Sequence, residues 1–477
     1  MVRENCGVVA AYSLKGENVI PIVIDCLRAL QHRGQEAWGV AVPNKPPYKE
    51  IGLVTESSYK FKEIEEKYSS NAAIGHVRYS TIGKSNLDNA QPLKVKDLCI
   101  AHNGTIANVE ELANMVGGCS FTPQSMNDTL LAAKRIVGLL NKDEDMNQAL
   151  SMLKNDMIGS FCFTFVTDHG KIFAARDPKG FRPLVLGYHK ETETYVIASE
   201  SCAFLAVGAE LIRDVEPGEL IKVSDDGIEY QQFANEKPHA HCAFEYTYFA
   251  HPTSIMEGVN IYIARKNIGR ELAKKFPLSA DVVIPVPDSA RPVALGYAQE
   301  LGIEFEEGLL KDRYSKKGKL RSFIEPYQKD REEITKWIIP IREVIKDKEV
   351  IVVDDSIVRG TSSIAIVNAI RQAKAKKINM IVAYPSIKFP CYAGIDFPSS
   401  EELIAYTVSK DSNDDINKLV AKAINADFVG YNDPDTLAKA IGLPREELCF
   451  TCSTGDYSNL GLIEKPIFRS RKEVKGE

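Results

Sequence analysis

The pattern of apolar and polar positions divides the chain into two parts. Up to about residue 235, short β-rich runs alternate with turn residues, and helical periodicity is confined to stretches near 18–33 and 126–140. The β-rich runs include Ile74–Tyr79, Leu98–Ala101, Phe161–Val166 and Tyr195–Ser199. We therefore expect the first half to consist mostly of β-sheet.

From about residue 260, the pattern changes to strands that alternate with helices. Apolar strands and helical stretches are predicted in the order Val282–Pro285, 290–301, Val350–Val353, 361–374 and Met380–Ala383. Strands rich in Val and Ile, separated by helices, indicate a parallel sheet covered on both faces. The polar, proline-containing stretch Ala234–His241 marks the predicted junction, so we expect two domains of different build.

Length and charge exclude several function classes. The 477 residues correspond to roughly two to four domains. With 59 Lys+Arg against 65 Asp+Glu, the net charge is -6, which does not favour a nucleic-acid partner. No apolar run approaches the ~20 residues of a membrane span, and charged residues interrupt any signal-peptide core. We expect a cytoplasmic protein without a membrane partner.

The most specific segment is Val350–Ser363, which reads VIVVDDSIVRGTSS. An apolar strand ends in Asp354 and Asp355, and a short loop with Gly360 then opens a helix. Free N–H groups at such a turn, together with the positive end of the helix dipole, can hold a phosphate. Because two carboxylates repel a bare phosphate, they must face ribose hydroxyls or a Mg²⁺ that the substrate carries. For a bare DD pair, the alternative is a helix-capping strand end.

The whole string VVDDSIVRGTS resembles the phosphoribosyl-diphosphate (PRPP) signature of type I phosphoribosyltransferases, in the form carried by glutamine PRPP amidotransferases. The resemblance implies PRPP-binding roles for Asp354, Asp355, Ser356, Arg359, Gly360, Thr361 and Ser362. Pro287–Ser289 looks like the family's pyrophosphate-side loop, which implies that Ser289 joins both aspartates in binding one Mg²⁺ with PRPP. Lys311–Tyr314 is similar to the start of the family's flexible loop, which implies that Arg313 contacts PRPP.

The first half resembles a class II glutamine amidotransferase of the N-terminal nucleophile type. The matching strings are CGVV at Cys6, LQHRGQE at 30–36, HVRYST at 76–81 and AHNG at 101–104. The resemblance implies an αββα sandwich and removal of a propeptide, Met1–Asn5. A thiol with a pKa of about 8.5 needs a base, and the freed α-amine, with a pKa of about 7.7–8.0, can act as one.

The same resemblance implies a role for each matching residue of the glutamine site. Cys6 attacks the side-chain amide of glutamine and forms a thioester. The Asn103 amide and the Gly104 N–H form the oxyanion hole. Arg78 holds the glutamine α-carboxylate, and Asp128 holds the α-ammonium.

Three histidines, His32, His76 and His102, lie in these strings. A histidine in such a run is more often a packed or hydrogen-bonded residue than a base. Since the α-amine already fills that role, we interpret all three as structural.

Four of the ten cysteines form a possible metal site. Cys449-x₂-Cys452 has a spacing that zinc and iron–sulfur sites share, so the spacing alone does not separate the two. Cys242 and Cys391 complete the set in contexts similar to the iron–sulfur branch of the family, which implies a structural 4Fe-4S cluster. Five further cysteines are interpreted as small buried apolar residues, namely Cys26, Cys99, Cys119, Cys162 and Cys202.

The chain departs from the family pattern at three places. Six Lys/Arg fall within 311–321, which indicates either a cationic lid over diphosphate or a solvated loop. ITKWII at 334–339 has Thr335 and Trp337 where the family has basic residues that contact nucleotide, which leaves nucleotide feedback open. Trp38 replaces a small residue.

The resemblance covers the chain from Cys6 to about Gly455 and implies an amidophosphoribosyltransferase, which makes 5-phosphoribosylamine from glutamine and PRPP in the first committed step of purine synthesis. The expected parts are a propeptide (1–5), a glutamine amidotransferase domain (6–235) and a phosphoribosyltransferase domain with the C-terminal cysteine segment (245–477). Purine nucleotide inhibitors and a homodimer or homotetramer are further expectations.

Two other functions compete with this interpretation. A non-catalytic regulator that binds PRPP or nucleotide would retain the phosphate loop, and the ITKWII departure favours it. A class II amidotransferase that makes an amino sugar or asparagine would share only the first half, and VVDDSIVRGTS argues against it.

Overall fold

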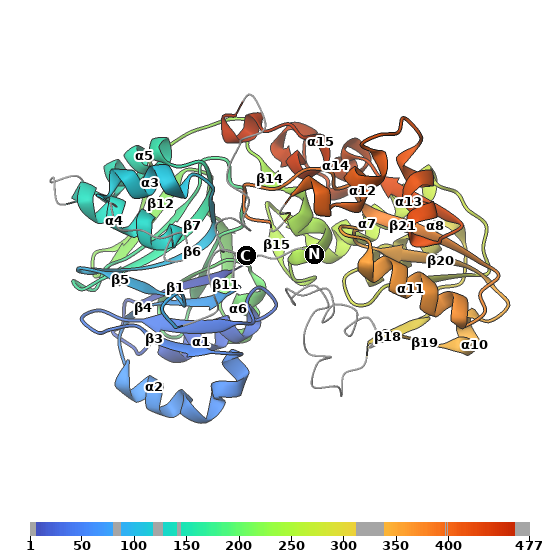
Figure 1. Ribbon diagram of the computed structural model, residues 1–477. Helices are drawn as coiled ribbons and strands as arrows, with labels where there is room; N and C mark the ends of the chain where they lie inside the picture. Colours follow the sequence, from blue (N-terminus) through green and yellow to red (C-terminus); the bar gives the residue numbers. More distant parts are fainter. Residues whose placement is uncertain are drawn as a thin grey trace.

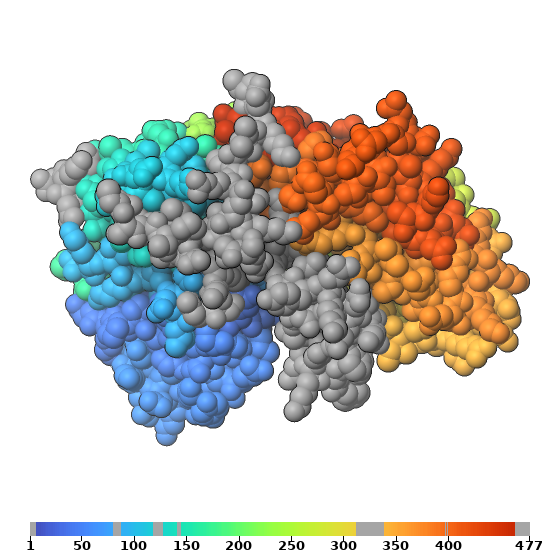
Figure 2. All heavy atoms as spheres, in the orientation of Figure 1, coloured from blue at the N-terminus to red at the C-terminus, as the bar shows by residue number. Residues whose placement is uncertain are grey.

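The computed structural model describes residues 6–79, 87–117, 127–140, 145–311 and 338–462, except residues 396 and 398. None of the helices in these ranges is both long enough and apolar enough to cross a membrane. The two halves of the sequence occupy largely separate parts of the molecule, blue to green for the first and yellow to red for the second (Figures 1 and 2).

Two antiparallel sheets stack face to face in the first half (Figure 1). In spatial order, the seven-stranded sheet contains β11 (Glu210–Asp214), β9 (Val185–His189), β10 (Thr194–Ala198), β1 (Gly7–Ser13), β4 (Ala72–Arg78), β2 (Ala37–Ala41) and β3 (Tyr48–Ile51). The six-stranded sheet contains β13 (Gly227–Gln232), β12 (Glu219–Ser224), β8 (Ile172–Arg176), β7 (Gly159–Thr167), β6 (Leu98–Ile106) and β5 (Leu93–Val95). Along β1, Val8, Ala10 and Tyr12 pack between the sheets, whereas Val9 and Ala11 pack against helices, as the two-residue period of a strand requires.

Helices cover the outer face of each sheet. The seven-stranded sheet packs against α1 (Ile20–Ala29), α2 (Phe61–Lys67) and α6 (Cys202–Val207), with the 3₁₀ turn η1 (Val54–Lys60) beside them. The six-stranded sheet packs against α3 (Val109–Met115), α4 (Asp128–Leu140) and α5 (Met146–Asp156). The expected αββα order is confirmed, and the helices predicted near 18–33 and 126–140 are α1 and α4.

The prediction of a mostly β first half missed the other helices of this domain. One of them, α5, begins with a capping box that the sequence contains. The Asp145 side chain accepts from the Gln148 N–H, and the Gln148 side chain accepts from the Asp145 N–H.

A parallel sheet forms the centre of the second half, as predicted. Its spatial order is β17 (Val282–Pro285), β20 (Glu349–Asp354), β21 (Lys377–Pro385) and β22 (Phe428–Asn432). One face packs against α7 (Ile261–Lys275), α8 (Arg291–Leu301) and α14 (Pro434–Ile441), and the other against α10 (Arg342–Ile345), α11 (Thr361–Gln372) and α13 (Ile416–Ile424). Because the strands are parallel, the loops after β17 and β20 meet at one edge of the sheet.

The chain passes from the first domain to the second at β14 (His241–Cys242), which begins at the last residue of the predicted junction. This strand pairs in parallel with β23 (Leu448–Cys449) from the end of the described chain. The smaller elements are η2 (Glu245–Phe249), β15 (Ile255–Met256), β16 (Val259–Asn260), β18 (Leu309–Lys311), β19 (Ile338–Pro340), η3 (Ser400–Glu402), α12 (Ile404–Ser409), η4 (Arg445–Glu447), α15 (Thr451–Thr454) and η5 (Ser458–Leu460).

Candidate active site

Cys6 lies directly before β1, the middle strand of the seven-stranded sheet. Its side chain is 8% exposed, and its thiol donates a hydrogen bond to the Tyr79 carbonyl at 3.6 Å. The Arg33 Nε donates to the Cys6 carbonyl at 3.1 Å. Since the even-numbered residues of β1 face the second sheet, Cys6 lies at one end of the space between the sheets.

β6 carries the two expected oxyanion donors. Asn103 is 1% exposed, and its Nδ2 has no acceptor among the described residues. At Gly104, which has φ +150°, a Cβ would lie 2.2 Å from the Ser160 carbonyl oxygen, so no larger residue fits. A buried N–H without an acceptor costs about 1–3 kcal/mol. The Asn103 amide is therefore the kind of donor that a bound oxygen would satisfy.

One hydrogen bond brings β6 close to the nucleophile. The His76 Nε2 donates to the His102 carbonyl at 3.1 Å, and His76 lies opposite Val8 in the pairing of β4 with β1. His102, the residue before Asn103, therefore contacts the seven-stranded sheet at His76. His76 in turn pairs with Val8, two positions after Cys6.

Arg78 and Asp128 come from the end of β4 and the start of α4. Arg78 ends β4 with 4% of its surface exposed, on the same inner face as His76. Asp128 begins α4, and its Oδ2 accepts from the Ile106 N–H at 3.3 Å and lies 3.9 Å from His102 Nδ1. Asp128 is thus held against the strand that carries the oxyanion donors.

The structure favours a structural role for His76 and His102. Burial lowers the pKa of His76 to about 3 and also lowers that of His102. The His102 Nδ1 lies 3.1 Å from Thr129 Oγ1, and its ring packs 4.8 Å from that of Phe163. Both imidazoles are therefore neutral and packed near neutral pH.

A buried network of charges, which the sequence interpretation did not identify, joins the two domains. Glu245 of the second domain accepts from Arg33 at 2.8 Å and from Arg182 at 2.9 Å. Arg33 also pairs with Glu200, a fully buried carboxylate. The Arg182 guanidinium continues to the Ala393 carbonyl at 2.9 Å. The only sequence signal was charged residues inside apolar strings, such as Glu245 in CAFEYTYF.

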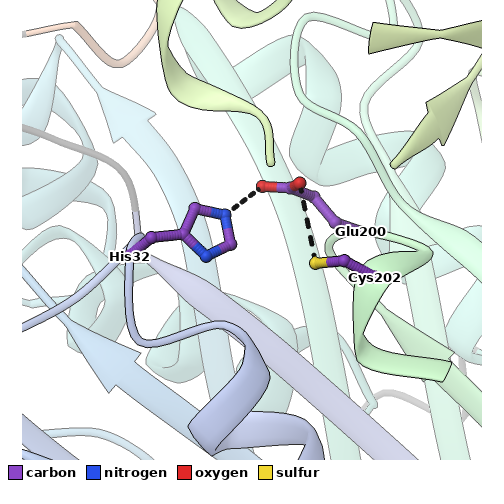
Figure 3. Close-up of side chains that lie close together, drawn as sticks. All are labelled: His32, Glu200 and Cys202. Atoms are coloured by element: carbon purple, nitrogen blue, oxygen red, sulfur yellow. Dashed lines mark hydrogen bonds and ion pairs between the residues drawn. The ribbon is translucent and has the colours of Figure 1, made fainter. Parts of the chain in front are cut away.

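His32 belongs to the same network (Figure 3). The His32 Nε2 lies 2.8 Å from Glu200 Oε1, and the Cys202 thiol donates to Glu200 Oε2 at 3.8 Å. The second oxygen also accepts from Ser254 Oγ and from the His251 N–H, each at 2.7 Å. Burial would raise the pKa of Glu200, but His32 and Arg33 hold it well below its ordinary value. The His32 ring is therefore held against a buried carboxylate, which is consistent with the structural interpretation of this histidine.

The phosphate loop has the predicted strand–turn–helix form. β20 ends at Asp354, and Gly360 has φ +81° immediately before α11, which begins at Thr361. A Cβ at Gly360 would lie 2.4 Å from Ile404 Cδ1. Thr361 and Ser362 occupy the first turn of a 12-residue helix, where free backbone N–H groups are available to an anion.

Ser289 and the two aspartates come together as predicted. The Ser289 hydroxyl, from the loop after β17, donates to Asp355 Oδ2, and the Ser356 hydroxyl donates to Asp355 Oδ1 at 2.7 Å. Burial and the neighbouring charge of Asp355 raise the pKa of Asp354 well above its ordinary value. The two adjacent buried carboxylates therefore repel each other when both are charged. A hard cation, which prefers oxygen ligands, fits the set formed by these carboxylates and the Ser289 hydroxyl.

Arg359 lies in the same loop, directly before Gly360. Its Nε donates to Glu402 at 2.9 Å, while its buried Nη1 has no acceptor among the described residues. Met1–Asn5, Arg313, Thr335 and Trp337 lie outside the described residues, as do Cys119 and most of the predicted lid at 311–321.

The four predicted cysteine ligands line one cavity. Cys242 lies opposite Cys449 in the pairing of β14 with β23, and Cys391 and Cys452 complete the lining with Tyr384. Burial raises the pKa of each of the four thiols, to about 12 for Cys242 and about 11 for Cys391. Thiolates in this cavity therefore need a bound cation to offset the cost of burial.

Four thiols that line one cavity are a ligand set for a bound metal ion or cluster, and the donor atoms alone fit zinc and iron–sulfur groups alike. The other four described cysteines away from the nucleophile, Cys26, Cys99, Cys162 and Cys202, are buried as predicted.

Comparison with known proteins supports the two-domain assignment. A glutamine amidotransferase domain family matches residues 76–206, and a phosphoribosyl transferase domain family matches residues 253–420. The amidophosphoribosyltransferase of Methanocaldococcus jannaschii is 38% identical, in an alignment that covers 97% of this chain and 100% of that protein.

Two solved structures share the whole architecture. The glutamine PRPP amidotransferase of B. subtilis, complexed with ADP and GMP, has a TM-score of 0.81 and 35% identity, and covers 95% of this chain and 97% of its own. A structure described as the allosteric regulatory enzyme of purine biosynthesis has a TM-score of 0.84 and 34% identity, and covers 98% of this chain and 99% of its own. The chain therefore belongs to the amidophosphoribosyltransferase family, with a glutamine amidotransferase domain followed by a phosphoribosyltransferase domain.

Proposed function

We propose that the protein catalyses the amidophosphoribosyltransferase reaction, in which glutamine, PRPP and water yield 5-phosphoribosylamine, glutamate and pyrophosphate. The observation that carries the proposal is the presence of two complementary sites in one chain. Cys6 lies near an amide donor without an acceptor among the described residues, and paired carboxylates lie at a phosphate-binding turn. The relative from M. jannaschii, which aligns over its full length, bears this enzyme name.

In the first domain, glutamine hydrolysis begins at Cys6 after the propeptide is removed. The α-amine of Cys6 takes the thiol proton, and the sulfur attacks the amide carbon of glutamine. Asn103 Nδ2 and the Gly104 N–H stabilise the oxyanion, and ammonia leaves with the proton that the amine returns. Water then hydrolyses the thioester to glutamate. Arg78 and Asp128 hold the two charged groups of the glutamine α-carbon.

In the second domain, PRPP binds at the turn that opens α11. The N–H and hydroxyl groups of Thr361 and Ser362 hold the 5-phosphate, with Ser356, Arg359 and Gly360 beside them. Asp354, Asp355 and Ser289 would hold the ribose and the Mg²⁺ that accompanies the diphosphate. When bound, Mg²⁺ neutralises charge on the leaving diphosphate.

The transfer step joins ammonia to the ribose. The nitrogen lone pair forms a bond to C1 while the bond from C1 to the diphosphate oxygen breaks, and one ammonia proton passes to solvent.

The buried charge network joins the two domains. It runs from the Cys6 carbonyl through Arg33 and Glu245 to Arg182, without an exposed charged group. From Arg182 the network continues to the Ala393 carbonyl, in the segment that follows Cys391.

We also propose that Cys242, Cys391, Cys449 and Cys452 hold a 4Fe-4S cluster of structural role. The support is the cavity that all four cysteines line. Anaerobically purified protein should contain about four iron atoms per chain, and Cys452→Ala should lose them, whereas Cys26→Ala should not. One zinc and no iron per chain would contradict the cluster.

Purine nucleotide inhibition and a homo-oligomer remain proposals. The B. subtilis relative was solved with ADP and GMP, which supports testing these two nucleotides. Inhibition of PRPP turnover by ADP and GMP, and light scattering of the purified chain, would test each proposal directly.

The central test is Mg²⁺-dependent pyrophosphate release from PRPP, with glutamine and separately with ammonium. We expect release with both, loss of only the glutamine reaction in Cys6→Ala, and no loss in the matched control Cys26→Ala. Mass spectrometry establishes whether Cys6 is the first residue. Release with neither substrate, although Cys6 is freed and PRPP binds, would favour the non-catalytic regulator.

A further inference from the structure

Three metal-ligating side chains gather outside the sites described above. One ligand atom from each of His239, His241 and Glu447 lies within 4.8 Å of the others. His239 and His241 lie at the junction of the two domains, and Glu447 ends η4, directly before β23. Because His241 lies opposite Leu448 in the parallel pairing of β14 with β23, Glu447 is brought beside the two imidazoles.

The surroundings of His241 leave one ring nitrogen available as a ligand. Its Nδ1–H donates to the Gly180 carbonyl at 2.9 Å, so Nε2 carries the lone pair. Arg176 Nη2, 3.4 Å from Nδ1, donates to the same carbonyl at 3.1 Å, so the two groups are donors to one acceptor. A backbone carbonyl that fixes the tautomer in this way is the usual support of a metal-ligating histidine.

The local charge also permits a cation. The positive charge of Arg176 is paired with Glu257 at 2.7 Å. The Glu447 carboxylate has no hydrogen bond or ion pair to any other side chain in the described part of the chain. His239 and Glu447 are partly exposed, which gives an ion a route from solvent. The two imidazole rings are tilted by 60°, with centroids 5.5 Å apart, so they do not stack on each other.

A second cluster of possible metal ligands contains a carboxylate whose two oxygens both already accept hydrogen bonds. In the group His32, Glu200 and Cys202 (Figure 3), both oxygens of Glu200 already accept hydrogen bonds. That carboxylate is buried and has an arginine partner, so a cation would have to displace existing bonds. The Glu447 carboxylate, by contrast, is partly exposed and has no arginine partner among the described residues.

We propose that His239, His241 and Glu447 form a second metal site, separate from the four cysteines, that binds a divalent transition-metal ion such as Zn²⁺. Two imidazoles and one carboxylate are ligands that zinc prefers, and water completes a tetrahedral set at the exposed side. The ion would bridge the segments that lead to Cys242 and to Cys449, and so would strengthen the pairing of β14 with β23.

The test uses Co²⁺ as a spectroscopic probe on the full-length protein, prepared without oxygen and with its cysteine site in the same state throughout. Cobalt bound by imidazole and carboxylate gives weak visible bands without the sulfur-to-metal absorption of thiolate ligands. His239→Ala and Glu447→Gln change partly exposed side chains, and the second keeps the side-chain shape. The matched controls are the exposed residues His169→Ala and Glu446→Gln.

We expect the unaltered protein and both controls to bind one Co²⁺ without sulfur-to-metal absorption. Each ligand variant should bind that ion at least tenfold more weakly, at unchanged iron and thiol content. Zn²⁺ should raise the thermal unfolding midpoint of the unaltered protein and not that of the variants. Equal affinity in all five proteins, or a loss that appears only together with loss of the thiolate absorption, would overturn the proposal. Metal-free melting curves establish that each variant is folded.

Discussion

Replacing Asn103 by alanine should separate catalysis from stability. In the free protein the Asn103 Nδ2 is buried without an acceptor among the described residues. Removing it relieves a penalty of about 1–3 kcal/mol, which offsets the packing energy that truncation of the side chain removes. We therefore expect the free energy of unfolding of Asn103→Ala to remain within about 1 kcal/mol of the unaltered value.

Catalysis should respond very differently. Loss of one oxyanion-hole donor typically costs about 10²–10³ in kcat, or about 2.7–4 kcal/mol. Glutamine-dependent pyrophosphate release should fall by this factor, whereas the ammonium-dependent reaction in the second domain should be unchanged. The assay is steady-state pyrophosphate release with each nitrogen source, combined with urea unfolding of the same samples.

The chain offers a matched control for stability. Asn432 is 4% exposed, and its amide is satisfied on both sides, donating to the Ala383 carbonyl and accepting from the Asp433 N–H, each at 2.9 Å. Asn432→Ala should therefore destabilise by about 1–3 kcal/mol. If Asn103→Ala loses as much stability as Asn432→Ala, or keeps glutamine turnover within threefold, the assignment of Asn103 as a donor that awaits substrate is wrong.

Three further changes test other parts of the structure. Gly104→Ala should abolish glutamine turnover and destabilise the protein, because its Cβ would lie 2.2 Å from a carbonyl oxygen, whereas Gly138→Ala, with open space around it, should be neutral or stabilising in urea unfolding. His76 has a pKa of about 3 in the folded protein and of about 6.5 in the unfolded chain. As the pH falls below 6.5 the unfolded chain binds a proton that the folded protein does not, so the free energy of unfolding decreases, by about 2 kcal/mol at pH 5. His76→Asn should remove this part of the acid dependence, and an unchanged pH profile would contradict it. Ser289→Ala removes the hydroxyl bonded to Asp355 and should lower kcat/KM for PRPP by about 10–100-fold without changing glutaminase activity, measured as glutamate release; an equal loss of both activities would point to misfolding.

Local sequence patterns predicted much of the fold. The continuous Val/Ile run at Val350–Val353 and the helix at 361–374 correspond to β20 and α11, because a buried parallel strand and an amphipathic helix each impose their own period on the sequence. The short helices of the first domain, such as α3 and α6, were missed, since six or seven residues are too few to establish a helical period. The candidate chemistry was also local in origin, since strings such as VVDDSIVRGTS hold their residues at fixed spacing.

Contacts between distant segments were decided only by the tertiary structure. The bond from Ser289 to Asp355 joins loops 66 positions apart, and the salt bridge from Arg33 to Glu245 joins residues 212 positions apart. Nothing near Arg33 in the sequence specifies which carboxylate it will meet, because that depends on how the two domains pack. The gathering of His239 and His241 with Glu447 likewise depends on the pairing of β14 with β23. The sequence thus determined the two domain types and most of their chemical groups, whereas tertiary packing decided which buried charges and ligands became neighbours, since pairing and burial energies depend on distance in space and not along the chain.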